Sequence, residues 1–468
     1  MRNKSITSGS IWKNMLTFFF ALLLGAFFQQ LYNTIDAIIV GRAVGSDALG
    51  AVGGSAAMVV NLFLGFFLGL SSGATVVISQ FYGAGKREEI DKAVHTAIAL
   101  SIAGGAVITA IGVLISPWLI SVMKTPVEQA EAGTMYLRIF FLGMIPNLIY
   151  NMGAGILRAV GDSRRPLIVL IISCIVNILL DIIFVVGFGL GRMGDVYGVA
   201  GVAVATILCQ LISAAIIIFI LVRSDDSYRL DIRKIRFDAI MLSKIIKIGI
   251  PAGFQTTTYT LSNTLIQVSI NSLGKDVASA WAAYGKVDVL FWMTIGSLGT
   301  VATTFAGQNY GAGKYDRVRK STRQALAIAT VITIPLSIFF CVFGNILLGI
   351  FVVDKNVIDI GVQMIYYLAP FYITYVCVEI FAGVLRGMGD AFIPMMITLF
   401  GICVLRVIWI LFVFPMHRTV EMIEMSYRVT WCTTSAMFLV YYLIYINMKG
   451  IKNEKARGEN DWKRAHKL

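Results

Sequence analysis

Long apolar stretches recur along the whole chain and are separated by short polar connections. Two representative stretches run from Met15 to Leu31 and from Ala97 to Ile115. With its flanking residues, each is long enough to cross a hydrocarbon layer of about 30 Å as a helix. The pattern predicts an all-α integral membrane protein with twelve transmembrane helices, at residues 14–40, 50–80, 93–115, 133–157, 166–190, 197–222, 241–272, 277–306, 322–351, 358–385, 393–414 and 427–448.

The composition agrees with this prediction and excludes a soluble domain. Of the 468 residues, 57% are hydrophobic and only 14% are charged, which is too few to cover a soluble surface.

When each of the 39 Lys and Arg residues is assigned to the nearer membrane side, 29 fall on one side, nine fall on the other, and Arg406 remains within a span. Because basic residues mark the cytoplasmic side, both termini are expected to face the cytoplasm across a plasma or inner membrane. The net charge of +13 is therefore interpreted as a topology signal, and nucleic acid is not expected as a partner.

Two sequence motifs occur twice, each time 228 residues apart. Residues 79–86 read SQFYGAGK and residues 307–314 read GQNYGAGK, identical at six of eight positions. Residues 154–166 read AGILRAVGDSRRP and residues 382–394 read AGVLRGMGDAFIP, identical at seven of thirteen positions. The chain is therefore predicted to be a duplicated six-helix unit. Because the offset covers an even number of spans, the two six-helix lobes would be related by a pseudo-twofold axis along the membrane normal.

The repeat divides the chain into an N-lobe at 1–222, a cytoplasmic linker at 223–240, a C-lobe at 241–448 and a basic cytoplasmic tail at 449–468. The joint mixes basic residues with isoleucine and leucine, so it fits either a helix lying in the membrane interface or a solvated linker.

In the repeated motifs, glycine permits a tight turn at a helix end. These loops are predicted to be mainly structural, since no phosphate-binding pattern surrounds them.

Four carboxylates stand out within the predicted spans, at Asp36, Asp181, Asp288 and Glu379. A carboxylate within a membrane is costly unless it faces a cavity or a partner, so each is a candidate functional residue. Asn177 lies four residues before Asp181 and shares its helix face, and Thr206 lies in the next span. These oxygens can hold Na⁺, or the two acids can carry a proton, because repulsion between neighbouring carboxylates favours protonation of one. The alternative is that Asp36 caps a helix end and Asp181 bonds locally.

The second half of the chain lacks this set of oxygens. The residues 228 positions after Asp36, Asn177 and Asp181 are Thr264, Leu405 and Trp409. The duplication has therefore diverged, and ion coupling is expected in the N-lobe.

The C-lobe has charges and aromatic residues of its own. Glu379 and Arg406 lie on spans that could be adjacent, and they are candidates for a structural ion pair or for a role in substrate binding or coupling. Aromatic walls suit planar cations through cation–π contact, although aromatic residues are common in membrane proteins generally. The candidate cavity residues of the C-lobe are Tyr259, Trp281, Tyr284, Asp288, Trp292, Tyr372, Glu379 and Arg406.

The motifs together resemble those of the MATE family of multidrug and toxic-compound exporters. The resemblance covers about residues 10 to 448, and it is carried by LYNTIDAIIVGRAVGSDALGAVG at 31–53, the two YGAGK loops, the two LRxxGD turns, NILLD at 177–181 and GVAVAT at 201–206. It implies a two-lobe fold of twelve helices, cation-coupled export, and an N-lobe cation site at Asp36, Asn177, Asp181 and Thr206. The chain departs from many family members in having no proline between residues 11 and 41, and its seventh span carries no carboxylate.

The expected function is therefore export of drug-like organic compounds, often cationic, by an alternating-access antiporter that uses H⁺ or Na⁺. The alternative is a flippase for lipid-linked oligosaccharides, which would need a cationic cavity, whereas bases inside the spans are few. An enzyme is not expected, because the three histidines provide no His-rich metal site. No cofactor is expected, and the partners would be the substrate, the ion and membrane lipids around a monomer.

Overall fold

The computed structural model describes residues 6–448, and the predicted basic tail at 449–468 lies outside these described residues. Within them the chain is helical and has no strand. Ten helical segments are long and apolar enough to cross a membrane, and the bent pair α5 (Val127–Leu142) and α6 (Met144–Ala159) is an eleventh candidate. The remaining predicted span is occupied by α9 (Ala239–Asn271), a helix of 33 residues rich in threonine and serine. The predicted all-α membrane fold is thus confirmed.

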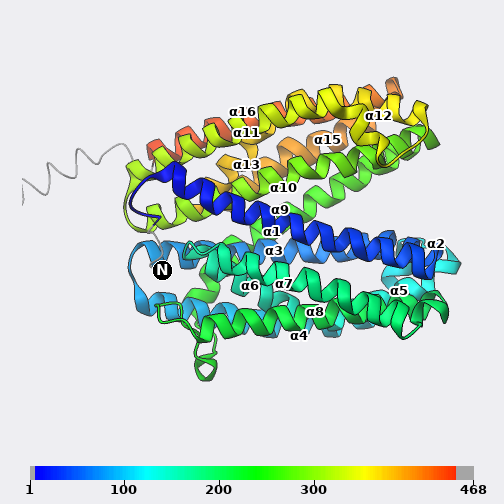
Figure 1. Ribbon diagram of the computed structural model, residues 1–468. Helices are drawn as coiled ribbons and strands as arrows, with labels where there is room; N and C mark the ends of the chain where they lie inside the picture. The colour runs from blue at the N-terminus through cyan, green and yellow to red at the C-terminus, as the bar shows by residue number, and fades with distance from the viewer. Residues whose placement is uncertain (1–5, 449–468) are drawn as a thin grey trace, which may run out of the picture. The chain divides into compact units, whose positions relative to one another are not determined.

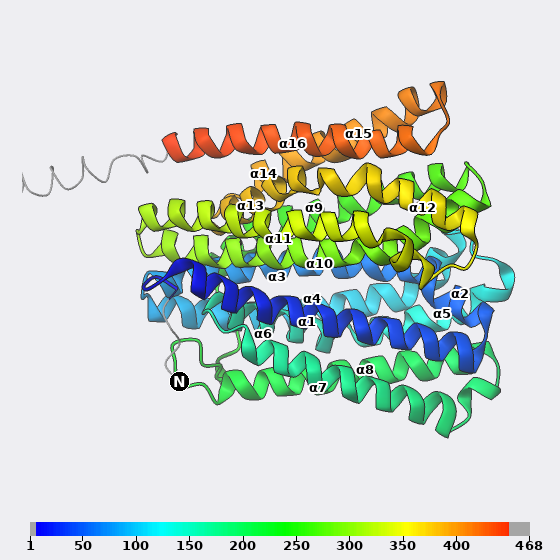
Figure 2. The same cartoon turned by 45° about the horizontal axis from the view of Figure 1, so that its top comes forward.

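Figure 1 shows these helices in chain colours, and Figure 2 shows them from a second direction. The other helices of the first half are α1 (Ile11–Ile39), α2 (Ser46–Gly53), α3 (Ser55–Gly83), α4 (Arg87–Val122), α7 (Arg164–Asp181) and α8 (Asp195–Val222). Those of the second half are α10 (Lys275–Gly311), α11 (Tyr315–Gly349), α12 (Lys355–Leu368), α13 (Tyr372–Gly387), α14 (Phe392–Thr398), α15 (Leu405–Ile408) and α16 (Val420–Met448).

The helices form two compact units. In the first, α4 packs against α3, α5 and α6, and α8 packs against α5, α6 and α7. In the second, α10 packs against α11, α12 and α13, and α13 also contacts α16. Each unit buries apolar side chains between its own helices, which leaves the remaining apolar surface for lipid.

The division between the two units falls within α9, since residues up to Thr260 group with the first unit and residues from Leu261 with the second. Glycines explain why the first part of α9 is bound so closely to α3. A Cβ added to Gly69 would lie 2.2 Å from the backbone nitrogen of Gly253, and one added to Gly73 would lie 2.4 Å from a carbonyl oxygen of α9. Small residues four apart allow such backbone contact between membrane helices. The lobe boundaries inferred from the repeat remain a prediction.

The duplication is visible in the backbone. Gly85 and Gly313, in the two YGAGK loops, have φ of +68° and +69°, and Gly161 and Gly389, in the two LRxxGD turns, have φ of +90° and +95°. After each glycine of the first pair, the lysine N–H donates to the carbonyl five residues earlier, as in a Schellman motif. Glycine is favoured at these four positions because side chains disfavour positive φ.

The joint between the halves lies against α4 instead of forming a long interfacial helix. Between α8 and the start of α9 at Ala239, its only helix is one turn of 3-10 helix, η4 (Ile232–Lys234). The backbone N–H of Asp231 donates to Nε2 of the buried His95 at 3.1 Å, and the N–H of Asp238 donates to Oγ1 of Thr96 at 3.1 Å. A long interfacial helix is thus not found in this segment, which is a largely exposed connection joined to the first unit by hydrogen bonds.

Candidate functional site

Helices α1 and α7 meet in a register that sets two acids opposite each other. A Cβ added to Gly25 of α1 would lie 3.0 Å from Cδ1 of Leu170 in α7. Eleven residues further along each helix, which is about three turns, stand Asp36 and Asp181. Their carboxyl groups are close enough to interact with each other. The structure therefore brings together the two acids that the sequence singled out.

The register of α7 against α8 brings the other two candidates to the same place. Ser173 Oγ lies 2.5 Å from Ser213 Oγ, and the Cys209 thiol donates to the Ser173 carbonyl oxygen at 3.1 Å. One turn onward in α7 stands Asn177, and about one turn back in α8 stands Thr206, so these two residues lie at the same level of the helix pair. The four oxygen-bearing side chains predicted for the N-lobe thus gather where α1, α7 and α8 meet.

This cluster, called here the N-lobe acid cluster (Asp36, Asn177, Asp181 and Thr206), is short of partners, and three of its side chains are buried while Asp36 is half-buried. Asn177 and Asp181 are fully buried. Among the described residues, Asp36 Oδ1, both carboxylate oxygens of Asp181 and the side-chain amide of Asn177 have no hydrogen-bond partner. No ion pair within residues 6–448 includes either acid. Each buried polar group left unsatisfied costs roughly 1–3 kcal/mol, which a cation bound among these oxygens would recover.

Two tyrosines lie beside the acids and were not identified from the sequence. Tyr32 and Tyr136 are each close enough to Asp36 and Asp181 to interact with them electrostatically. Tyr32 precedes Asp36 by one helical turn, so the spacing of i and i+4 could have identified it. Tyr136 lies on α5, and nothing in the local sequence connects it to the acids.

Both acids lie next to a local change in helical geometry. The π-helical segment η1 (Val40–Val44) begins one turn after Asp36, and η2 (Ile182–Gly187) begins at the residue after Asp181. A π-helical segment widens the turn and shifts the hydrogen bonds of the backbone, and such segments are frequent at functional sites. The positions of η1 and η2 therefore support a functional role for this region.

Most of the candidate cavity residues of the C-lobe also come together. Asp288 on α10 accepts a hydrogen bond from Trp292 Nε1 at 2.6 Å and another from the Tyr372 hydroxyl. Tyr284 donates to the Tyr372 oxygen at 2.8 Å. The Trp281 and Tyr284 rings are 5.4 Å apart. These five side chains, called here the Asp288 network (Trp281, Tyr284, Asp288, Trp292 and Tyr372), combine one carboxylate with an aromatic surface.

Arg406 lies beside this network and is almost completely buried, with 3% of its surface exposed. Its Nη1 donates to Asn263 Oδ1 at 3.2 Å and its Nη2 to Thr430 Oγ1 at 3.5 Å. Its guanidinium carbon lies 4.0 Å from the centre of the Tyr427 ring, and that ring is 5.9 Å from the ring of Trp281. The sequence had not identified Asn263, Tyr427 or Thr430, which lie on two other helices.

The predicted ion pair between Glu379 and Arg406 is wrong. Among the described residues neither takes part in an ion pair. Glu379 on α13 packs against α10, where its carboxylate lies over Gly299, whereas Arg406 on α15 faces α9 and α16. The last candidate, Tyr259, is half-buried on α9, in the part of that helix that groups with the first unit.

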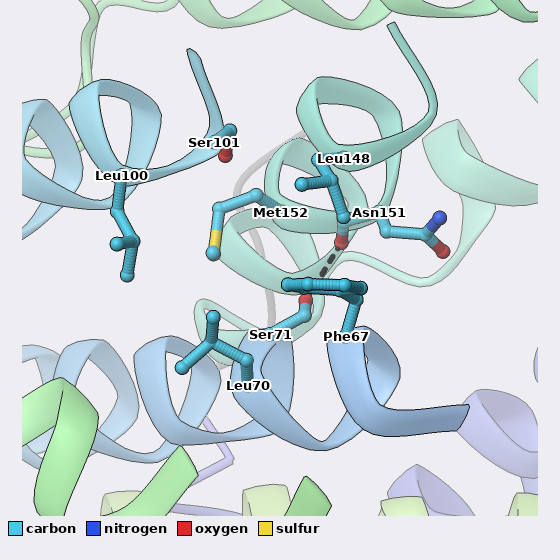
Figure 3. A pocket seen from close by; sticks show the side chains of 8 residues that line it. All are labelled: Phe67, Leu70, Ser71, Leu100, Ser101, Leu148, Asn151 and Met152. Atoms are coloured by element: carbon cyan, nitrogen blue, oxygen red, sulfur yellow. Dashed lines mark hydrogen bonds between the residues drawn. The ribbon is translucent and has the colours of Figure 1, made fainter. Parts of the chain in front are cut away.

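A small cavity in the first unit has a different character. Its volume is about 10 Å³, and Ser71, Ser101 and Asn151 contribute polar atoms to a mainly apolar wall. Figure 3 shows these side chains, with the Ser71 hydroxyl donating to the Asn151 carbonyl oxygen at 2.9 Å. The cavity has room for about one water molecule and is far too small for a drug-sized compound.

The comparisons with known proteins agree on one family. The MatE family model matches residues 21–183 and 251–411, one segment in each repeat. The chain is 26% identical to the protein named "Probable multidrug resistance protein YoeA" from Bacillus subtilis, over 84% of this chain and 85% of that protein. It is 27% identical to "Probable multidrug resistance protein NorM" from Thermotoga maritima, over 81% of this chain and 80% of that protein.

Solved structures show the same fold. A MOP superfamily transporter from Pyrococcus furiosus has a TM-score of 0.88 at 21% identity, and the match covers 97% of this chain and 99% of that chain. A multidrug resistance MATE family transporter in an outward-facing conformation has a TM-score of 0.87 at 21% identity, with the same coverage. At this identity the likeness concerns the fold alone.

Proposed function

The chain belongs to the MatE family and is a membrane transporter rather than an enzyme, and from this premise we propose that it exports small organic compounds, often cationic, in exchange for H⁺ or Na⁺. The compounds leave the cell while the ion enters. The names of the curated relatives, which are multidrug resistance proteins, support this direction.

The observation that carries the proposal is the N-lobe acid cluster. Two facing carboxylates with no basic partner among the described residues are costly in a membrane protein. A proton neutralises one of them, and a sodium ion takes both as ligands together with the oxygens of Asn177 and Thr206. The Thr206 hydroxyl donates its hydrogen to Val202 O at 3.0 Å, which leaves its lone pairs for an ion. Either cation therefore stabilises this arrangement.

The electrical driving force is sufficient for concentrative export of a substrate without net charge. One charge that moves through a potential of 100 mV supplies about 2.3 kcal/mol. At equilibrium this energy supports a gradient of roughly 50-fold for a substrate whose export carries no other charge. The proposed cycle alternates access to one cavity, so that cation entry from outside to Asp36 and Asp181 is followed by release of substrate to the outside.

The Asp288 network is the proposed contact surface for the substrate. Its two tryptophan rings, Trp281 and Trp292, are partly exposed and offer π faces to planar cations. Asp288 supplies a negative charge that accepts hydrogen bonds only from neutral donors. The asymmetric distribution of Lys and Arg favours a cell membrane location with both termini in the cytoplasm. The N-lobe at 1–222 and the C-lobe at 241–448 would then be the two bodies that move.

Efflux of ethidium from reconstituted vesicles tests the proposal, with a proton gradient and a sodium gradient imposed separately. The wild type should export ethidium under one of the two gradients, and Asp36→Asn should abolish this export while the protein still folds. Asp359→Asn is a matched control, because it removes an exposed carboxylate of α12 outside the cluster, and it should export at the wild-type rate. Full transport by Asp36→Asn would refute the coupling role. Absence of efflux under both gradients would refute drug export, and the flippase activity would be tested next.

A further inference from the structure

Arg406 is a buried cation without an acidic partner. It lies within the membrane-spanning segment Phe392–Met416, and no ion pair among residues 6–448 includes it. Its hydrogen-bond acceptors, the Asn263 amide oxygen and the Thr430 hydroxyl, are both neutral, and its Nε has no acceptor. Charged side chains in the membrane interior are costly and usually mark a functional site, and buried charges normally have a partner of opposite sign. The guanidinium is therefore missing an anion.

Asp288 is the complementary case in the same unit. Its carboxylate accepts hydrogen bonds from the neutral groups of Trp292 and Tyr372 and forms no ion pair among the described residues. Tyr427 interacts electrostatically with both Asp288 and Arg406, so the acid and the base lie on the same aromatic cluster. The two charges nevertheless form no ion pair with each other.

We propose that Arg406 and Asp288 form a two-pole binding site for zwitterionic aromatic compounds, in which Arg406 binds the carboxylate of the substrate. The aromatic part of the compound lies along Tyr427 and Trp281, and its cationic part is nearer Asp288. This inference rests on the proposed export function and specifies the substrate class, because a simple organic cation would leave Arg406 without its anion.

Access to Arg406 is available through its present acceptor. Asn263 is exposed, whereas Arg406 directly behind it is buried. A substrate carboxylate that displaces the Asn263 amide oxygen would reach Nη1, and Nε would offer a second donor. Guanidinium groups bind carboxylates with two parallel hydrogen bonds, which are stronger than bonds to a neutral amide. The exchange of partners therefore favours the anion.

A pair of dyes that differ in one charge tests the assignment. Rhodamine 110 carries a free carboxylate, and rhodamine 123 is its methyl ester with the same ring system. Binding is measured by fluorescence anisotropy on the purified full chain in detergent, without an ion gradient. Arg406→Gln should weaken rhodamine 110 binding roughly tenfold to a hundredfold, the range of a hydrogen bond to a charged group, and should leave rhodamine 123 within about twofold.

Arg428→Gln is the matched control, because Arg428 also lies over aromatic rings of this unit but donates to the Tyr367 carbonyl oxygen. It should leave the ratio of the two dye affinities unchanged. An equal loss of both dyes in Arg406→Gln, or no loss of either, would overturn the proposal. If that variant does not fold, competition on the wild type decides: benzoate should displace rhodamine 110 and benzamide should not, and equal displacement by the two, or by neither, would overturn it.

The two proposals fail in different ways. A wild type that binds rhodamine 110 through Arg406 but exports neither dye under either gradient would refute coupled export and leave the two-pole site. If rhodamine 123 is exported under a gradient but Arg406→Gln changes neither dye affinity, the two-pole site is refuted and the coupled-export proposal stands.

Discussion

The two repeats have the same glycine turns but carry different charged residues in their interiors. The glycines of the YGAGK loops and of the LRxxGD turns have matching positive φ values in both halves. A π-helical segment begins beside Asp181, at Ile182, and another, η7 (Trp409–Val413), begins at the residue that corresponds to Asp181. The first repeat nevertheless contains an acid pair, and the second contains a buried arginine.

The difference shows which features a duplicated membrane protein must retain. Loop glycines and helix ends determine how each half folds, so a change there affects the whole unit. An interior polar residue can change more freely if its neighbours satisfy the new side chain. Trp409 illustrates this, because its indole N–H donates to the Met422 carbonyl oxygen at 2.8 Å. We infer that divergence left ion binding to the first repeat and substrate contact to the second.

The largest expected difference between the repeats concerns Asp181 and its counterpart. Asp181→Asn removes one of the two carboxylates that a coupling ion requires, and it should reduce gradient-driven ethidium efflux at least about 100-fold, because an ionic contact in a membrane is worth several kcal/mol. Trp409→Phe, at the corresponding position, removes one neutral hydrogen bond and should retain most of the activity. Both variants are reconstituted and measured under the gradient that drives the wild type.

Comparable losses in the two variants would show that the position matters for packing instead of ion binding. Measurement of protein yield and the unfolding temperature separates these causes, since Asp181→Asn relieves a buried charge and should not lower stability. A selective loss of efflux with unchanged stability is the result that supports the comparison.

The sequence predicted the helices well because apolar runs of membrane length have few alternatives in lipid. It did not predict where helices break. The fourth span bends by 52° between α5 and α6, at Gly143, where an added Cβ would lie 2.7 Å from Ile207 on α8. The bend depends on packing against a helix distant in sequence, and π-helical segments such as η2 likewise have no local signature.

For the candidate site, the sequence was informative where helical spacing alone decides proximity. Asn177 and Asp181 are one turn apart, so their shared face was predictable. Tyr136 and the partners of Arg406 come from other helices, and their contacts depend on how those helices pack. The mistaken pairing of Glu379 with Arg406 has the same origin, since similar depth in the membrane does not place two residues on facing helix surfaces.

A smaller loss of stability, equal in the two repeats, is expected at the glycines of the YGAGK loops, where both repeats have the same backbone conformation. Gly85→Ala and Gly313→Ala each place a side chain at a φ near +68°, which costs about 1–2 kcal/mol. No atom lies within 4 Å of a Cβ added at either position, so the cost comes from the backbone alone. Gly296→Ala is the control, because it lies inside α10 with equally open surroundings, and it should be neutral or stabilising by roughly 0.5–1 kcal/mol. Unequal losses in the two loops, by denaturant unfolding, would contradict their equivalence.

The smallest effect is expected at the aspartates of the two LRxxGD turns, which have different hydrogen-bond and ion-pair partners in the two repeats. In the second LRxxGD turn, Asp390 accepts a hydrogen bond from the Tyr441 hydroxyl, whereas in the first turn Asp162 pairs with Arg165 at 3.3 Å. Tyr441→Phe should cost about 1 kcal/mol of unfolding free energy. Arg165→Gln should cost less, about 0.5 kcal/mol, because the Arg165 side chain is 48% exposed and water screens the pair, and because backbone N–H groups still bind Asp162. Hydrogen exchange at residues 389–391 should increase in Tyr441→Phe more than exchange at residues 161–163 increases in Arg165→Gln. The reverse order would show that the surface ion pair stabilises the first turn more than the tyrosine stabilises the second.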